Sequence, residues 1–304
     1  MTIKRVLSIM FVLLVVFLLV FYWFIPFNTT EFYEYSSDLS SNFSLNSQEG
    51  SMQFYDNMRY PSSNITYKIH DCPLYKQNDI EQSFGIISNL TILNFSSVSD
   101  NEDISALCDD RGGFERGLFI AGEGGPMNIT RLENFNVIFQ GEILLIKETN
   151  CDKPIVGMHE IFHALGFGHS PNKKNIMYDV SRCDQEVGED IINKINELYS
   201  YPSYPDLSFE NISAVMNGKY LDVSLSVRNN GLSNSEKAKV IIYADEKSIK
   251  EVELDPLAIG HGTKITLGKI WVPKINVFEL KFVIDYESFE IEKTNNEKKL
   301  EIKN

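Results

Sequence analysis

The stretch His159 to His169, which reads HEIFHALGFGH, constrains this chain more than any other. His159 and His163 are four residues apart, so a helix would place both imidazoles on one face, one turn apart. Gly166 follows, where a residue without a Cβ lets the helix end and the chain turn. We expect that turn to bring His169 back as a third metal ligand.

Three imidazoles without a fourth protein ligand are typical of a catalytic zinc site, because the remaining tetrahedral position stays open for water. A structural zinc site is normally closed by four protein ligands. Glu160 is not needed as a ligand, and beside the first His it can take the proton from the zinc-bound water. The spacing therefore predicts His159, His163 and His169 as ligands of one zinc ion and Glu160 as a catalytic general base.

The same stretch fits H-E-x-x-H-x-x-G-x-x-H, the signature of the metzincin peptidases, which place a methionine below the zinc in a tight turn. The run from Asn175 to Tyr178 (NIMY) resembles that turn. Because Ser170 directly follows the third His and Met177 directly precedes a Tyr, the chain is most similar to the matrixin-like branch. It departs from that branch at Phe162, where matrixins usually have Gly.

The resemblance, which covers roughly residues 62 to 200, implies an α+β catalytic domain with a mixed sheet, helices, and zinc on the active-site helix. It implies a zinc endopeptidase whose site has Met177 as its floor. Calcium is also compatible with the family, but no carboxylate cluster in the sequence identifies a site for it. The alternative is a non-catalytic, metal-containing adhesion or binding protein of the cell surface. The presence of Glu160 argues against it, since such a site has no use for a base.

The N-terminus predicts a membrane anchor. Residues 6–25 are almost entirely apolar and long enough to cross a bilayer as a helix. The run ends at Pro26 without a small-residue cleavage site, so we expect an uncleaved signal anchor. Lys4 and Arg5 place residues 1–5 in the cytoplasm and the catalytic domain outside the cell. The alternative is a cleaved signal peptide and a secreted protein.

Acceptor sequons for N-glycosylation support export, because every one of them lies beyond the anchor. They begin at Asn28, Asn42, Asn64, Asn89, Asn94, Asn128 and Asn211.

The chain has four cysteines, which an oxidising compartment could pair in three ways. We favour Cys151 with Cys183, which flank the histidine motif, and Cys72 with Cys108. In the alternative, the Cys72 thiolate occupies the open position of the zinc in a latent form.

Residues 26–61 are rich in Ser and Asn and are expected to form an extracellular stalk, followed by a zinc peptidase domain over 62–201. Hydrophobic spacing in that domain predicts strands at 64–70, near Val98, at 104–107 and at 135–146, and a helix over 79–95. We expect Leu118 to Ala121 to be the exposed edge strand that binds substrate. The glycine-rich run from Gly122 to Pro126 is interpreted as a turn.

The chain changes character at residue 206. Alternating runs separated by turn residues predict an all-β sandwich over 206–304. The run from Val227 to Gly231 (VRNNG) and the ending from Val283 to Asn296 resemble the CARDB family of immunoglobulin-like modules. That resemblance implies a spacer or adhesion module that contacts a cell-surface partner.

The formal net charge of −14 and the pI near 4.9 argue against nucleic acid as a partner. We expect a peptide or protein substrate, with the membrane contacted only through the N-terminal helix.

Overall fold

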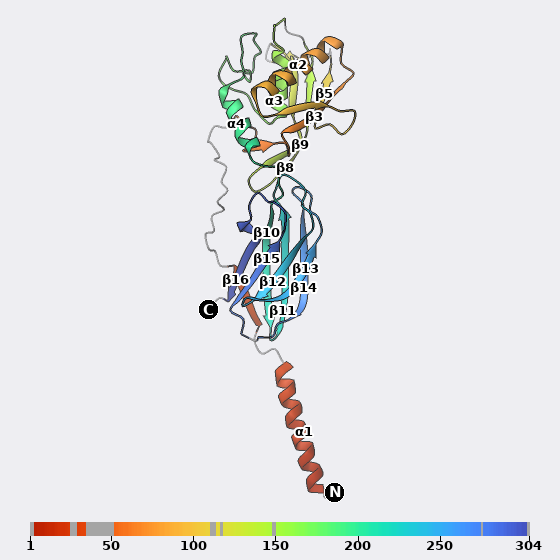
Figure 1. Ribbon diagram of the computed structural model, residues 1–304, viewed down its shortest axis with the longest axis vertical. Coiled ribbons are helices and arrows are strands. Elements are labelled where there is room, and N and C mark those ends of the chain that lie inside the picture. Colours follow the sequence, from red (N-terminus) through yellow and green to blue (C-terminus); the bar gives the residue numbers. More distant parts are fainter. Residues whose placement is uncertain are drawn as a thin grey trace. The chain divides into compact units, whose positions relative to one another are not determined.

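The computed structural model describes residues 3–24, 29–34, 52–109, 114–115, 118–147, 150–274 and 276–302 (Figure 1). Its first element is the apolar helix α1, Ile3–Phe24. The window Ile3–Val20 has a mean hydropathy of 2.6 and is not buried within the protein, which fits both a membrane span and a signal sequence. Residue 25 of the predicted anchor and residues 26–28 and 35–51 of the predicted stalk lie outside the described residues.

The chain divides into two compact units. One contains residues 42–205 with 230–234, and the other contains residues 1–41, 206–229 and 235–304.

The first unit is built on a mixed sheet. Five strands are parallel and follow the order β2 (Met58–Arg59), β9 (Asn136–Leu145), β5 (Ile104–Cys108), β3 (Asn64–His70) and β4 (Asn94–Ser97). A sixth strand, β8 (Gly122–Arg131), pairs antiparallel with β9. The described helices of this unit are α2 (Leu74–Leu90), α3 (Ile155–Ala164) and α4 (Glu189–Ser200).

Helix α2 packs on the sheet through the apolar face that its sequence predicts. Ile80, Phe84 and Ile87 are buried, and the ring of Phe84 stacks on that of Tyr67 in β3 at 4.2 Å between centroids. The predicted range 79–95 was wrong at both ends: the helix begins at Leu74, directly after Pro73, whose missing N–H costs nothing there, and it ends at Leu90, because residues 94–97 form strand β4.

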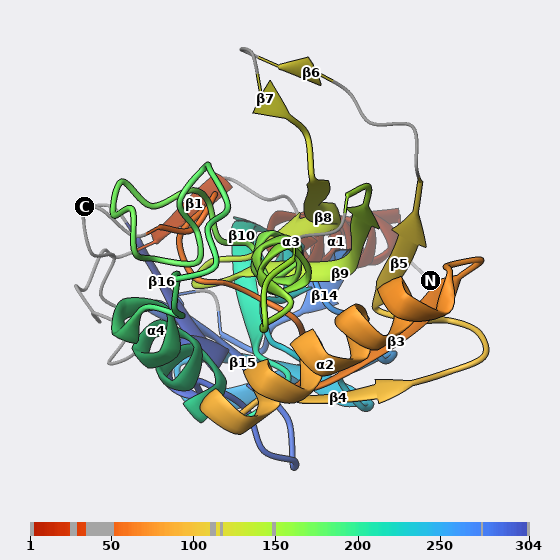
Figure 2. The same cartoon turned by 90° about the horizontal axis from the view of Figure 1, so that it is seen from above.

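The expectation about the edge strand was wrong. Leu118–Phe119 forms β7, which pairs only with β6 (Phe114–Glu115) in a separate two-stranded sheet (Figure 2). The edge of the main sheet is β8, which begins in the glycine-rich run interpreted as a turn. Glycine weakens a strand by propensity, but the pairing of β8 with β9 overrides that local preference.

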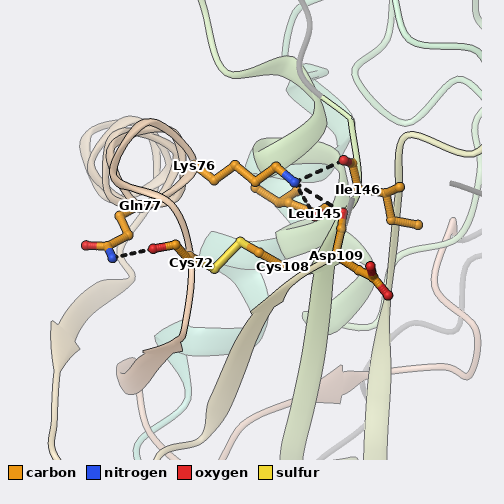
Figure 3. Close-up of a disulfide and its surroundings, with 7 residues drawn as sticks. All are labelled: Cys72, Lys76, Gln77, Cys108, Asp109, Leu145 and Ile146. Atoms are coloured by element: carbon orange, nitrogen blue, oxygen red, sulfur yellow. Dashed lines mark hydrogen bonds between the residues drawn. A yellow bond between two sulfur atoms is a disulfide. The ribbon is translucent and has the colours of Figure 1, made fainter. Parts of the chain in front are cut away.

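A buried lysine and a disulfide fix the start of α2 to the sheet (Figure 3). Cys72 is bonded to Cys108 at the end of β5. Lys76 is almost fully buried, and its ammonium donates hydrogen bonds of 3.0–3.3 Å to the carbonyl oxygens of Asp109, Leu145 and Ile146. An ammonium has three N–H donors, so these three acceptors compensate its burial.

The second unit is all β. Its strands follow the order β13-β12-β15-β16-β1-β10-β11-β14, and every neighbouring pair is antiparallel. Their bounds are β1 Thr29–Glu34, β10 Leu207–Asn217, β11 Tyr220–Asn229, β12 Ala238–Ala244, β13 Lys247–Leu254, β14 Gly262–Trp271, β15 Glu279–Asp285 and β16 Glu297–Ile302. A short 3₁₀ helix, η1 (Thr294–Asn296), precedes β16. Alternate residues of β11 face one core together with residues of β10, β12 and β15.

Part of the predicted stalk is folded. Strand β1 pairs with both β10 and β16 and buries Phe32, which is 5% exposed. Strand β2 and the residues before it belong to the first unit. Both strands are too short to show a clear alternation of apolar and polar side chains. They are ordered by backbone pairing with strands far away in the sequence.

Candidate metal centre

Helix α3 carries two of the predicted ligands in its buried interior. His159 and His163 lie in α3, and every residue of this helix is buried. The helix ends at Ala164, Leu165 caps it, and Gly166 then adopts φ +94°. A Cβ at Gly166 would lie 2.8 Å from the Cβ of Met58, so both the backbone conformation and the space require glycine there.

The turn brings the third imidazole onto the first two. The candidate ligand nitrogens of His159, His163 and His169 all lie within 4.8 Å of one another. Nε2 of His163 is 3.0 Å from Nε2 of His159 and 3.1 Å from Nε2 of His169. The N···N edge of a tetrahedral zinc site with Zn–N bonds of about 2.0–2.1 Å is about 3.3 Å, so the spacing fits one zinc ion.

Backbone carbonyl groups fix which nitrogen of each buried imidazole faces the centre. Nδ1 of His159 lies 2.7 Å from the carbonyl oxygen of Ile176, and Nδ1 of His163 lies 2.7 Å from that of Phe167. A carbonyl oxygen only accepts, so each Nδ1 carries the proton and each Nε2 presents a lone pair. Lone pairs 3 Å apart repel each other unless a cation lies between them, which makes this an arrangement for a metal.

Burial keeps the two helix imidazoles neutral. It lowers the pKa of His163 to about 4, with a further contribution from His159, and it lowers the pKa of His159 below its ordinary value. Neutral imidazole is the form that binds a metal, so neither group needs to lose a proton near pH 7.

The methionine turn is hydrogen-bonded to the third-ligand loop. The N–H of Ser170 donates to the carbonyl oxygen of Met177 at 2.7 Å, and the N–H of Met177 donates to Oδ1 of Asn175 at 2.9 Å. Met177 is fully buried, and its neighbour Ile176 supplies the carbonyl group that orients His159. The turn therefore orients His159, one of the predicted ligands, through its backbone.

A second disulfide closes the segment around the histidines. Cys151, shortly before α3, is bonded to Cys183, beyond the methionine turn. Together with the Cys72–Cys108 bond, this gives the two pairs favoured from the sequence and leaves no free cysteine in the chain. Cys72 is therefore not a zinc-blocking thiolate in this structure.

Glu160 lies between α3 and the edge strand. Its side chain is 5% exposed, and it packs against Gly122 and Gly124 of β8. Burial raises its pKa to about 8, and the charge of Glu123 acts in the same direction. A cation held by the adjacent histidines would oppose both effects and favour the carboxylate.

An aromatic segment beside the histidines was missed by the sequence analysis, which assigned it to the stalk. Gln53 forms a β-bridge with Phe167, and the N–H of Phe54 donates to the carbonyl oxygen of Gly166 at 2.9 Å. The ring of Phe54 stacks on that of His163 at 5.8 Å between centroids, although Phe54 is 46% exposed. The only local signal was a Phe-Tyr pair in a stretch rich in Ser and Asn.

Two histidines on one helix, a third that a glycine turn brings back to them, and a buried methionine in a tight turn are the arrangement of a metallopeptidase centre. The matrixin family model matches residues 38–200, more than half of the chain, and the CARDB model matches residues 204–300. The chain belongs to the matrixin family and carries a C-terminal CARDB domain.

One curated protein and one solved structure match parts of this chain. Macrophage metalloelastase of Rattus norvegicus is 29% identical over 167 residues, which cover 47% of this chain and 34% of the relative, so the chain spans about a third of that protein. A crystal structure of the CARDB domain of the PF1109 protein from Pyrococcus furiosus, in complex with di-metal ions, is 20% identical with a TM-score of 0.28. The match to that structure covers 33% of this chain and 87% of the chain in the crystal.

Proposed function

We propose that the chain is a zinc-dependent endopeptidase in which His159, His163 and His169 hold one zinc ion and Glu160 is the general base. The observation that carries the proposal is the convergence of three Nε2 atoms, two of them fixed as lone-pair donors by Nδ1 contacts to carbonyl groups. Membership of the matrixin family supports the same class of activity.

The chemistry divides between the metal and the chain. Bound zinc acts as a Lewis acid that lowers the pKa of water and polarises the scissile carbonyl group. The carboxylate of Glu160 takes a proton from the attacking water and delivers it to the nitrogen of the leaving amine. Its burial beside β8 keeps bulk water away from the proton it carries.

Substrate would bind along β8. One edge of this strand pairs with β9, and no other strand among the described residues pairs with its second edge. Glu123 and Asn128 are exposed on β8, which is consistent with a free surface. An extended peptide can add to such an edge through main-chain hydrogen bonds, while side chains occupy adjacent pockets. The strand lies against α3 at Glu160, so an added peptide would pass the proposed base.

Phe54 would contact the same bound peptide. Its exposed ring stacks on His163, and Arg131, the last residue of β8, lies over the neighbouring ring of Tyr55 at 4.7 Å. The two rings therefore extend from the metal centre to the end of the edge strand. We propose that they form an apolar wall that favours substrates with apolar side chains at that position.

We further propose that α1 anchors the protein in the cell membrane, with the peptidase and CARDB domains outside the cell. Two disulfides support an oxidising compartment, and the length and composition of α1 fit a single span. The CARDB domain would then act as a spacer or contact a cell-surface partner.

The experiment compares zinc content and peptide cleavage by the full-length protein in detergent micelles, beside Glu160→Gln and the matched control Glu123→Gln. Wild type should hold one zinc and cleave an unfolded protein, whereas Glu160→Gln should keep the zinc and lose about 10²–10⁴-fold in kcat. Glu123→Gln should stay within about threefold of wild type, since its carboxylate only perturbs that of Glu160. Zinc binding without cleavage by wild type would favour the alternative, a metal-containing binding protein.

A further inference from the structure

Four polar side chains gather at one end of the β-rich unit, in a place with no part in the peptidase proposal. Asp206 directly precedes β10, Glu290 lies in the connection after β15, and Asn295 and Asn296 form the end of η1. Asp206 is 1% exposed and Asn296 is 8% exposed, whereas Glu290 and Asn295 are half-buried.

Each carboxylate is held by an amide. Nδ2 of Asn295 donates to Oδ1 of Asp206 at 2.9 Å, and Nδ2 of Asn296 donates to Oε2 of Glu290. The N–H of Leu207 donates to the other oxygen of Glu290 at 2.8 Å. The two acids repel each other, and Lys293 offsets the charge of Glu290 only from an exposed position.

The amide oxygens of this group lack partners. Oδ1 of Asn295 and Oδ1 of Asn296 are both buried, and neither accepts a hydrogen bond. They are the only buried side-chain nitrogen or oxygen atoms without a partner in the described part of the chain. Each oxygen is bonded to the same carbon as the nitrogen that contacts a carboxylate, so both lie at the cluster itself.

A buried amide oxygen without a hydrogen-bond partner costs free energy in a protein without a ligand, and the repulsion between Asp206 and Glu290 adds to that cost. One cation would remove both costs. A rotation of each amide about its last bond would turn its oxygen toward the carboxylates without moving the backbone.

We propose that Asp206, Glu290, Asn295 and Asn296 form a calcium site in the CARDB domain. Two carboxylates and two amide carbonyl groups offer six oxygens when both acids bind in bidentate mode, which matches the coordination number and flexible geometry of Ca²⁺. The set contains no imidazole or thiolate, so it does not suit zinc. Mg²⁺ needs a near-ideal octahedron and retains several waters, for which this buried group is not arranged.

The site would tie the beginning of β10 to the β15–β16 connection. Asp206 enters β10 at the start of this unit, and its N–H donates to Oδ1 of the buried Asn229 at 3.1 Å. Calcium would therefore stiffen the point at which the chain enters the CARDB domain. This inference does not depend on the proposed peptidase activity.

The test is a calorimetric titration of the metal-depleted, full-length protein in detergent micelles with calcium chloride, in the presence of saturating zinc. Wild type should show a saturable site with a Kd on the order of 10⁻⁴–10⁻³ M, the range of extracellular modules. The isosteric variant Glu290→Gln and, separately, Asn296→Ala should each bind at least tenfold more weakly. Glu251→Gln, which removes an exposed acid of β13, should bind as wild type does.

Two results would overturn the proposal. Wild-type affinity in both Glu290→Gln and Asn296→Ala would place any bound calcium elsewhere in the chain. No saturable binding up to about 10 mM calcium, ten times the weak limit of that range, would mean that water alone satisfies the two oxygens. Thermal unfolding of each variant without calcium checks that the CARDB domain is folded, so that a lost site is not mistaken for a lost fold.

Discussion

Gly122 and Glu160 approach each other so closely that a Cβ atom added at Gly122 would lie 2.7 Å from Oε1 of Glu160. A Cβ at Gly124 would clash with the backbone carbonyl oxygen of the same glutamate. The edge strand and helix α3, which carries two of the predicted metal ligands, therefore fit together only because β8 has glycine at these two positions. Side chains there would force Glu160 or the strand to move.

Gly122→Ala should displace the Glu160 carboxylate and lower kcat by about 10²-fold, since a displacement of about 1 Å in an active site costs that much. Zinc content should be unchanged, because Gly122 faces Glu160 and not the imidazoles. Steady-state kinetics together with metal analysis test this. The matched control is Gly125→Ala, where an added Cβ meets nothing within 4 Å, and its kcat should stay near that of wild type. Equal losses of kcat in Gly122→Ala and Gly125→Ala would contradict a specific contact with Glu160, because they would show that any side chain in this part of β8 lowers activity.

Phe54→Ala should change substrate selection and leave the metal in place. The ring contacts His163 only by stacking, whereas His163 is oriented by Phe167, so zinc should be retained. We expect kcat/KM to fall about tenfold for peptides with apolar residues beside the scissile bond, and less for polar ones. Cleavage of a peptide library measures kcat/KM for both the apolar and the polar peptides. Phe278→Ala, which removes an equally large exposed ring from the CARDB domain, should leave the profile unchanged. An unaltered cleavage profile in Phe54→Ala would show that this ring does not contact the substrate.

The two disulfides should differ in their effect on zinc. Each closes a loop of similar length, with sequence separations of 32 and 36, so removal of either should cost about 3–4 kcal/mol of stability. Only the Cys151–Cys183 bond encloses the three histidines proposed as ligands and the turn that contains Met177. Its double Ser variant should bind zinc at least tenfold more weakly, as measured by competition with a chelator. The Cys72/Cys108 double variant is the matched control, and equal weakening in both would contradict a local role.

The stability of the CARDB domain should fall as the pH rises. Burial raises the pKa of Glu290 to about 7, above its ordinary value of 4.5. Folding therefore favours the protonated carboxyl group, and this contribution is complete below about pH 4.5 and lost as the pH rises through about 7. The calcium-free Tm should decrease between about pH 5 and pH 8, and scanning calorimetry should show a smaller decrease in Glu290→Gln. The same decrease in both proteins would assign the effect to other groups.

Local sequence patterns predicted those helices and strands whose own residues carry a motif or a regular spacing of apolar side chains. The four-residue spacing of His159 and His163 placed both on one helix, and Gly166 was recognised as the turn that returns His169 to them. Apolar spacing likewise identified α2, β3, β5 and β9 to within a few residues. The roles of the ligands and of Glu160 remain predictions until metal binding and cleavage are measured.

The features missed from the sequence depend on contacts between distant segments. Glycines at 122 and 124 have the local signature of a turn, and only the nearby side chain and backbone of Glu160 explain why a strand needs them. Phe54 and the strand that contains Phe32 lie in a stretch of low hydrophobicity, and each is ordered by backbone partners far along the chain. Neither propensity nor periodicity records such pairing.

The most direct test of the central claim is X-ray absorption spectroscopy of the zinc-loaded, full-length protein, combined with zinc analysis. Three imidazole nitrogens and one open position predict one zinc per chain, with three nitrogen ligands at about 2.0–2.1 Å, one oxygen ligand and no sulfur. His169→Ala should lose one of those nitrogens. A sulfur ligand, four protein ligands, or no zinc in a folded protein would contradict the three-histidine catalytic centre.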